Sequence, residues 1–392
     1  MIILDKFPAA EEFYKTYWGR KPFLVRGGVD VDAFDGFIDA DMLAGLSMED
    51  ELKSRIVLTA PEGGKWTCEH GPFEEDRYDT IGDKNWSLLV QNVEQYHTDT
   101  ANLLRNFNFS PRWLLDDIMV SYSATGGSVG PHTDSYHVFL VQGMGKRIWT
   151  VGDAPIQNEQ LIEGLDLKVL KDGVAGEGVE VNIGDILYIP PHFAHEGVTL
   201  DHAMTFSVGF LGPKLSELFI EYGQYLEHHA EALDTRYSGQ GLNADSSCFT
   251  IAPNAQKSVQ GALTDALQGQ SFSAWLAAYF STPTDSEDEQ QREEPLTDDQ
   301  VKARLKAGEG LYRPEHIKLS ITASQNGMLN LSVFGAVITM EAARHGFVHW
   351  LNNNATVSFE NVSALGGEDE LLPLITQLYN QGVLYFEGDE MV

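Results

Sequence analysis

The sequence contains little cysteine, few basic side chains and no long apolar run. Its two cysteines, Cys68 and Cys248, argue against a disulfide framework and for a reducing compartment. No uninterrupted apolar stretch is long enough to cross a bilayer, so we expect no membrane association. The first residues, Met1 to Asp5, lack the basic segment and the apolar run of a signal peptide. We therefore expect a cytoplasmic protein.

Basic residues are scarce relative to acidic ones, with 26 Lys and Arg against 58 Asp and Glu and a formal net charge of -32. Such a surface repels the phosphates of nucleic acids and attracts basic partners. We therefore expect a basic protein partner and no direct contact with nucleic acid. On charge alone, an equally good interpretation is solubility or adaptation to salt, which requires no partner.

Residues 126–134, Gly-Gly-Ser-Val-Gly-Pro-His-Thr-Asp, place two metal ligands, His132 and Asp134, at the mouth of a predicted strand. A strand repeats every two residues, so both side chains leave on the same face. A third ligand, His195, follows a second Gly-Asp turn and an apolar strand. Two imidazoles and one carboxylate leave coordination positions open, which is the ligand set of non-haem Fe(II) oxygenases. These three residues are the predicted metal ligands and catalytic centre.

The same three letters occur at His97, Thr98 and Asp99, so the motif alone is weak evidence. No glycine-rich segment and no strand surround His97, and Thr98 or Asp99 is typical of the N-cap of a helix. We interpret His97 as structural. The segment before His132 is rich in glycine, and the run Val138 to Val141 is typical of a strand buried on both faces.

A turn at residues 143–145 leads to a returning strand that begins near Arg147. This strand would place Arg147 on the wall of the same cavity, where a guanidinium grips a carboxylate with two hydrogen bonds. A diacid such as 2-oxoglutarate, which chelates iron at one end, needs such a grip at the other. The alternative, with about even odds, is that Arg147 only covers the strand surface beside Lys146.

The chain resembles the JmjC-type, cupin-fold ribosomal oxygenases. The resemblance rests on the order and spacing of residues 130–134, 142–149, 188–197 and 206–210. It implies that His132, Asp134 and His195 bind Fe(II) and that Arg147 anchors 2-oxoglutarate. It also implies hydroxylation, by O2 and 2-oxoglutarate, of an arginine in a large-subunit ribosomal protein, the sixteenth. A histidyl hydroxylase, a lysine demethylase and a non-catalytic metal-binding cupin scaffold are the alternatives, because a fold does not fix a substrate.

For several polar residues near these motifs, both a functional and a structural role agree with the sequence. Ser121 and Ser123 alternate with apolar residues, and the resemblance places both hydroxyls inward. In the functional interpretation they bind the co-substrate's distal carboxylate or the target side chain. In the structural interpretation they form hydrogen bonds with nearby backbone groups. Thr205 and Ser207 share this ambiguity. His192, three residues before His195, belongs to the opposite face or to a turn and is a candidate for the site entrance.

A chain of 392 residues is too long for one typical domain. We predict an α+β protein with a double-stranded β-helix catalytic domain and its N-terminal flank over residues 1–214. Residues 215–282 are predicted to be helical, with an apolar surplus, and the resemblance implies that they form a homodimer. Residues 283–300 read as a mobile acidic linker. For residues 301–392 the resemblance implies a winged helix, and its few basic residues favour packing or protein recognition over DNA binding.

Overall fold

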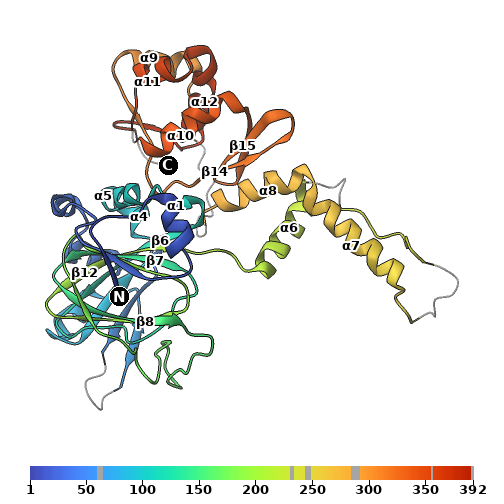
Figure 1. The fold of residues 1–392 in the computed structure, drawn as a ribbon. Coiled ribbons are helices and arrows are strands. Elements are labelled where there is room, and N and C mark those ends of the chain that lie inside the picture. Colours follow the sequence, from blue (N-terminus) through green and yellow to red (C-terminus); the bar gives the residue numbers. More distant parts are fainter. Residues whose placement is uncertain (60–64, 230–233, 243–248, 284–291, 355, 390–392) are drawn as a thin grey trace. The chain divides into compact units, whose positions relative to one another are not determined.

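The structure, a computed structural model, describes residues 1–392 except 60–64, 230–233, 243–248, 284–291, 355 and 390–392. Cys248 and much of the predicted acidic linker lie outside the described residues. The chain divides into two compact units, Met1–Gly212 and Pro213–Val392 (Figure 1). Across the described segments, every helix is either too short or too polar to span a membrane.

The first unit contains two β-sheets. The smaller has the order β11 (Phe193–Thr199), β8 (Arg147–Pro155) and β9 (Val179–Val181). The larger has nine strands, in the order β1 (Ile2–Leu4), β2 (Phe23–Val25), β10 (Ile186–Ile189), β7 (His137–Met144), β12 (Ala203–Phe210), β6 (Leu115–Ser123), β5 (Trp86–Val90), β3 (Ser54–Leu58) and β4 (Thr67–His70). Neighbouring strands are antiparallel except β1 and β2. This is the layout of a double-stranded β-helix.

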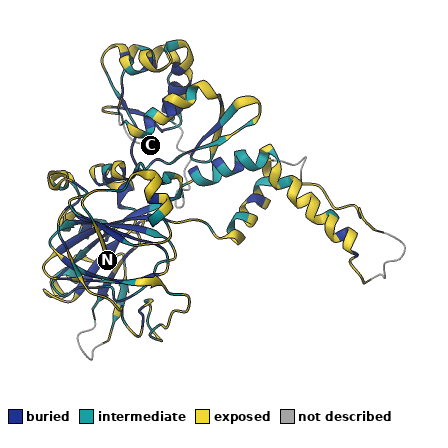
Figure 2. Cartoon of the chain, in the orientation of Figure 1, coloured by how far each residue is buried: buried dark blue, intermediate teal, exposed yellow. Residues whose placement is uncertain are grey.

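Strand β7 is buried on both faces, as its apolar sequence predicts. Val138 and Leu140 belong to a core cluster shared by strands of the two sheets, including β8, β9 and β11. Phe139 and Val141 alternate with them and belong to the larger cluster on the other face of the nine-stranded sheet. Figure 2 shows this buried interior in dark blue. The central strand thus fixes the position of the residues at both of its ends.

Short helices supply the other side of the larger cluster. Helix α1 (Ala10–Glu12) continues as a π-helix over Phe13–Tyr17, and Trp18 packs against the core. The remaining helices of this unit are α2 (Ala40–Leu46), α3 (Glu75–Thr80), α4 (Val93–Tyr96) and α5 (Thr98–Ala101). The Trp18 ring stacks on His137, with ring centroids 3.7 Å apart. His137 is therefore part of an aromatic stack.

The second unit combines helices with two small sheets. The sheets are β14 (Leu319–Ala323), β15 (Met328–Val333) and β16 (Ala336–Glu341), and β17 (Thr356–Val357), β13 (Leu311–Tyr312) and β18 (Tyr385–Phe386). The helices are α6 (Leu215–His229), α7 (Pro253–Gln268), α8 (Gln270–Ser281), α9 (Asp298–Lys306), α10 (His345–Asn353), α11 (Phe359–Leu365) and α12 (Glu368–Asn380).

Helix α8 is joined to the first of these sheets by side-chain hydrogen bonds. The Thr322 hydroxyl donates to the Ser273 carbonyl at 2.7 Å, and the Ser281 hydroxyl donates to Ser332 at 2.9 Å. Trp275 and Ala277 on the same helix are buried. Helix α8 is therefore a structural part of the module that contains β14 to β16.

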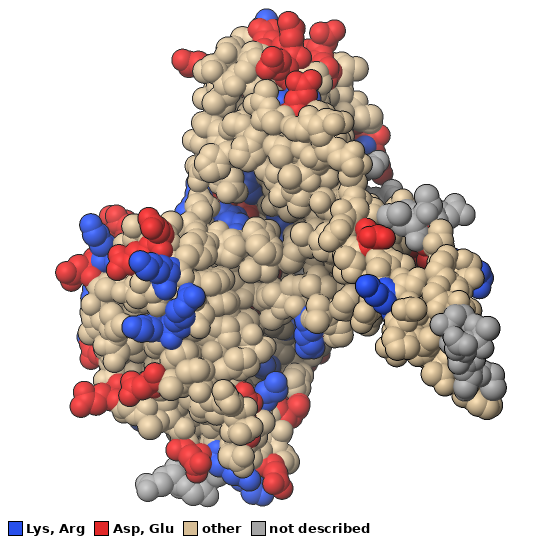
Figure 3. All heavy atoms as spheres, turned by 45° about the vertical axis from the view of Figure 1, so that its right-hand side comes forward, with Lys and Arg blue, Asp and Glu red and all other residues tan. Residues whose placement is uncertain are grey.

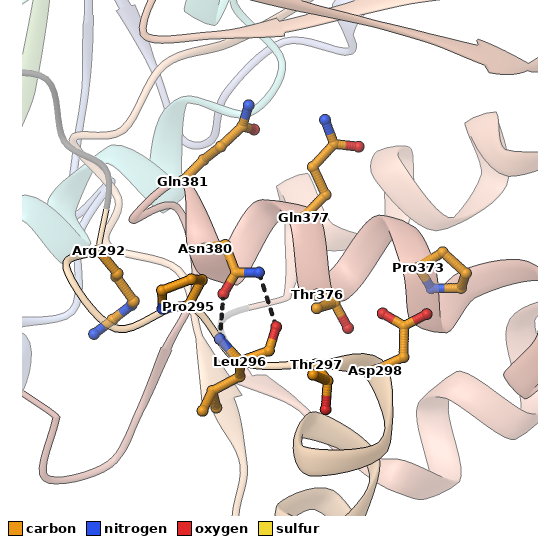
Figure 4. A pocket seen from close by; sticks show the side chains of 10 residues that line it. All are labelled: Arg292, Pro295, Leu296, Thr297, Asp298, Pro373, Thr376, Gln377, Asn380 and Gln381. Atoms are coloured by element: carbon orange, nitrogen blue, oxygen red, sulfur yellow. Dashed lines mark hydrogen bonds between the residues drawn. The ribbon is translucent and has the colours of Figure 1, made fainter.

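A hollow of about 490 Å³ lies beside helix α12. The side chain of Asn380 crosses it and pairs with both backbone groups of Leu296, accepting at 2.8 Å and donating at 3.0 Å (Figure 4). Thr376 also lines the hollow, and its buried hydroxyl has no hydrogen-bond partner. The segment before α9 is thus attached to α12, and α9 itself begins at Asp298 with a capping box from Thr297 and Gln300.

Candidate metal centre

The three predicted ligands meet in the first unit. His132 and Asp134 lie between β6 and β7, and His195 lies in β11. Nε2 of His195 is 3.4 Å from one Asp134 carboxylate oxygen, and Nε2 of His132 is 3.9 Å from the other. Among the described residues, this is a group whose ligand atoms all lie within 4.8 Å of one another. The structure therefore brings together residues that are 63 positions apart in the chain.

Backbone hydrogen bonds hold the ligand segment against β11. His132 and His195 exchange two bonds, N–H to O at 3.0 Å and 2.9 Å. One step further, the His192 N–H donates to the Asp134 carbonyl at 2.7 Å. At the other end, Thr199 exchanges bonds with Gly126 and Gly127 at 2.8 Å and 3.0 Å. The glycine-rich segment thus runs along β11 as an irregular extra strand.

Both imidazoles are oriented by a local hydrogen bond. Nδ1 of His132 lies 2.9 Å from the Gly130 carbonyl, and Nδ1 of His195 lies 2.9 Å from the Phe193 carbonyl. A carbonyl only accepts, so each Nδ1 carries the proton and each Nε2 presents a lone pair. Such bonds to the outer nitrogen fix the tautomer of metal-binding histidines.

The protonation states suit metal binding. Burial, together with the neighbouring His195, lowers the pKa of His132 to about 4, so its imidazole is neutral at neutral pH. Burial alone would raise the pKa of Asp134, but the neighbouring His195 and His132 outweigh it and lower this pKa to about 2. A neutral imidazole and an ionised carboxylate are the forms that bind a metal.

The donor set fits one iron ion. Nitrogen and oxygen ligands lie about 2.0 to 2.2 Å from a divalent transition metal, so atoms that share one ion are separated by no more than about 4 Å. The two imidazoles lie 3.4 and 3.9 Å from the Asp134 oxygens, and the three ligand atoms lie within 4.8 Å of one another, which is close to this limit. Two imidazoles and a carboxylate on one side of an ion leave positions for a chelating co-substrate and O2.

Arg147 is buried within the first unit, so it does not cover the strand surface beside Lys146. Its side chain is 4% exposed and donates to Ser123 at 2.6 Å and to Ser121 at 3.3 Å. Burial lowers its pKa to about 10, so the guanidinium remains charged at neutral pH. Ser123 also donates to Ser87 at 2.7 Å. The two serines therefore orient Arg147.

Two further buried residues close to Arg147 on β8 and β11 were not predicted from the sequence. Trp149 and Thr199 are buried, and neither the Trp149 indole nitrogen nor the Thr199 hydroxyl has a hydrogen-bond partner. The Arg147 Nε likewise has no hydrogen-bond partner. The sequence offered one signal, because Trp149 follows Arg147 at the two-residue strand period. Unpaired polar atoms are visible only in the folded arrangement.

His97, His192 and His137 lie outside the ligand set. His97 caps α5, and its Nδ1 accepts from the Thr100 N–H at 3.2 Å. Its structural role is confirmed, but the predicted cap at Thr98 or Asp99 is wrong, because His97 itself is the cap. His192 is exposed, in a turn with a φ of 66°. His137 lies 2.8 Å from the Tyr188 hydroxyl.

Thr205 and Ser207 are buried on β12. The Thr205 hydroxyl donates to the Gln142 side chain at 3.2 Å, which gives this residue a structural partner.

A double-stranded β-helix with a His-Asp-His centre defines the class of JmjC-type, metal-dependent oxygenases. Comparisons with known proteins agree. The JmjC domain family matches residues 102–218, and the ROXA-like winged helix family matches residues 263–385. The Escherichia coli (strain K12) ribosomal protein uL16 3-hydroxylase is 33% identical over 96% of this chain and 97% of its own length. A probable ribosomal oxygenase from Haemophilus influenzae is 38% identical over 53% of this chain and 51% of its own length.

Solved structures give the same result. A crystal structure of E. coli YcfD superposes with a TM-score of 0.80 at 33% identity, covering 97% of this chain and 98% of that one. The YcfD complex with cobalt and 2-oxoglutarate has a TM-score of 0.76 at 33% identity, covering 96% and 98%. The chain belongs to the JmjC-domain ribosomal oxygenases. The predictions of a JmjC barrel, a winged helix and a 2-oxoglutarate-dependent oxygenase are confirmed.

We predict that His132→Ala and His195→Ala each abolish tight binding of one divalent metal, because each removes one of three ligands. His97→Ala is the control, since His97 repeats the motif but caps a helix. Calorimetric titration with Mn(II), a redox-inert substitute for Fe(II), measures this. Loss of metal in the His97 variant with retention in the His132 variant would place the centre elsewhere.

Proposed function

We propose that this chain is an Fe(II)- and 2-oxoglutarate-dependent hydroxylase that acts on an arginine side chain of ribosomal protein uL16. The observation that carries the proposal is the convergence of His132, Asp134 and His195 on one point. Support for the substrate comes from the similar E. coli protein, a ribosomal protein uL16 3-hydroxylase. Support for the co-substrate comes from the YcfD complex with cobalt and 2-oxoglutarate.

The bound iron supplies activation of O2 coupled to oxidative decarboxylation of 2-oxoglutarate. One oxygen atom enters the substrate C–H bond as a hydroxyl, the other enters succinate, and CO2 leaves. His132, Asp134 and His195 would hold the ion and leave coordination positions free for the reactants. Arg147 receives the distal carboxylate, and the apolar residues between the two sheets exclude water.

Carboxylates near the centre support a cationic target. Burial raises the pKa of the Tyr136 hydroxyl, and Asp134, Asp117 and Asp116 raise it further. Asp117 is 9% exposed. Asp134 is itself a proposed metal ligand, whereas Asp116 and Asp117 are not, and Arg55 acts on the same pKa in the opposite direction. We take these nearby carboxylates as support for a cationic target over an acidic one.

The decisive experiment is mass spectrometry of uL16 after incubation with the protein, Fe(II), O2 and 2-oxoglutarate. We expect a mass increase of one oxygen that maps to a single arginine, and no increase with the His195→Ala variant. The matched substrate control replaces that arginine by lysine. Oxygen on a histidine, or loss of a methyl group from a lysine, would identify one of the alternative activities.

Arg147→Ala should raise the concentration of 2-oxoglutarate needed for half-maximal turnover at least 30-fold, since removal of one partner of a buried charged pair costs about 2 to 5 kcal/mol. Binding of Mn(II) should be retained. Ser121→Ala and Ser123→Ala should have smaller effects, because each removes one bond to the guanidinium. Lys146→Ala is the control, since Lys146 is exposed and pairs with Glu180 on the surface. An unchanged titration in Arg147→Ala would contradict this role.

The chain is proposed to form a homodimer through its helical middle. On α6, Leu215, Phe219 and Ile220 are 70%, 54% and 58% exposed, and Leu263 on α7 is 58% exposed. Large apolar side chains gathered on neighbouring helices are typical of an interaction surface. A second copy of the chain would cover them by a symmetric contact.

Light scattering at micromolar concentration should give twice the chain mass of 43.4 kDa. The double variant Phe219→Asp and Leu263→Asp should give the monomer mass with an unchanged circular dichroism spectrum. Lys214→Asp, an exposed charge change at the start of the same helix, is the control. A monomeric wild-type protein would overturn the proposal.

The acidic surface is proposed to gather the basic substrate. On the face drawn in Figure 3, the first unit shows residues of both signs, whereas acidic groups gather at the tip of the second unit, near α9 and α11. Part of that acidity lies in the first turns of α9 and α12, where carboxylates stabilise a helix. Long-range capture therefore rests on the net charge of -32 as a whole.

Turnover of a basic uL16 peptide should fall as salt rises from low to moderate concentration, through a higher KM at constant kcat, because exposed charges are screened over about 8 to 10 Å. Added nucleic acid should not compete for the free enzyme. A KM that is indifferent to salt would reduce the net charge to a determinant of solubility.

A further inference from the structure

Strands β8 and β11 run side by side from the metal ligand to the anchoring arginine. Their antiparallel register pairs His195 with Val151, residue 197 with residue 149, and Thr199 with Arg147. Because side chains alternate between the faces of a strand, His195, Gly197 and Thr199 share one face, as do Val151, Trp149 and Arg147. These residues are buried, while the intervening positions are less so. The shared inner face therefore connects the two ends of the co-substrate site.

This face carries three buried polar atoms without a hydrogen-bond partner. They are Arg147 Nε, Trp149 Nε1 and Thr199 Oγ1, and the three residues are 4%, 5% and 2% exposed. Buried polar groups are almost always paired, and an unpaired one carries a desolvation cost. All three atoms can donate a hydrogen bond. Their concentration on one face points to a ligand that is rich in acceptors and negatively charged.

Gly197 creates the space in which the indole lies. A Cβ at this position would come within 2.7 to 2.8 Å of the Trp149 ring atoms Cζ2, Cε2 and Cη2. The Trp149 ring therefore lies against the backbone of β11 at Gly197, which stands between His195 and Thr199 on the same face. Its centroid is 6.0 Å from that of His195. Trp149 is thus close to the metal end, whereas Thr199 pairs with Arg147 at the other end.

We propose that Trp149 and Thr199 are positioning residues for 2-oxoglutarate. The indole N–H donates to an oxygen of the keto-acid end, and the Thr199 hydroxyl donates to the distal carboxylate beside Arg147. This inference rests on the proposed function, in that it takes 2-oxoglutarate as the co-substrate. It adds a hydrogen bond at each end of that molecule and explains why a glycine stands at position 197.

The test measures binding without turnover. Calorimetry gives the Kd of 2-oxoglutarate in the presence of saturating Mn(II) for the wild type, Trp149→Phe and Thr199→Val. Each substitution keeps most of the side-chain volume and removes the donor. We expect each Kd to rise at least tenfold, because each variant loses a hydrogen bond to a charged group. The Kd of Mn(II) alone and the melting temperature should change little.

Two controls match the variants. Thr376→Val removes a hydroxyl that is also buried and unpaired, but in the second unit. Trp275→Phe removes the N–H of a tryptophan that is 4% exposed on α8. Both should leave the Kd of 2-oxoglutarate within twofold of wild type. A general effect of losing a buried polar group would appear in these variants as well.

Oxalate, which offers only a chelating end, separates the two assignments. Trp149→Phe should weaken oxalate binding, whereas Thr199→Val should not. Kd values for 2-oxoglutarate within twofold of wild type in both variants would overturn the inference while leaving the proposed function intact. A wild-type protein that binds Mn(II) but not 2-oxoglutarate would overturn both.

Discussion

The centre depends on the backbone pairing between the glycine-rich segment and β11. Reciprocal bonds between His132 and His195 place two ligands from distant parts of the chain at adjacent positions. The bond from His192 to the Asp134 carbonyl extends the pairing past the third ligand. Each imidazole is then fixed in tautomer by a carbonyl two residues earlier. Because the site is held by backbone rather than by long side chains, its geometry is set when the sheet forms, before any metal binds.

Strands β8 and β11 together contain both ends of the proposed co-substrate site. β11 supplies a metal ligand at one end and Thr199 at the other, while β8 supplies Arg147 opposite Thr199. A buried guanidinium with an unpaired Nε, beside other unpaired donors, costs stability in the protein alone. Such a cost is expected where a fold is shaped for a ligand, since the missing acceptors come from that ligand. The surrounding apolar side chains of Val138, Leu140 and Val151 limit the access of water, which could otherwise supply these acceptors.

The sequence predicted most of the centre because its ligands follow strand rules. His132 and Asp134 share the two-residue period, and the apolar run after them identified β7. The local sequence also separated His97, which caps a helix, from His132, which is a candidate ligand.

The sequence did not predict features that depend on contacts between residues far apart in the chain. It left the roles of Ser121 and Ser123 open, because only the folded sheet shows that both bond to Arg147. It also missed Trp149 and Thr199, because these residues stand out only through buried polar atoms that have no hydrogen-bond partner. The packing of α8 against β14 and β15 depends on contacts 49 to 51 residues apart that no periodicity reveals.

Our central proposal is that 2-oxoglutarate chelates a single iron bound by His132, Asp134 and His195, and that Arg147 holds the far end of the co-substrate. Anaerobic titration followed by visible absorption tests it most directly, because Fe(II) chelated by a 2-keto acid has a metal-to-ligand charge-transfer band. The account predicts that the band appears only when both Fe(II) and 2-oxoglutarate are present, and that it saturates at one equivalent of each per chain. A band that persists in His195→Ala, or a wild-type protein that binds both components without producing the band, would contradict it.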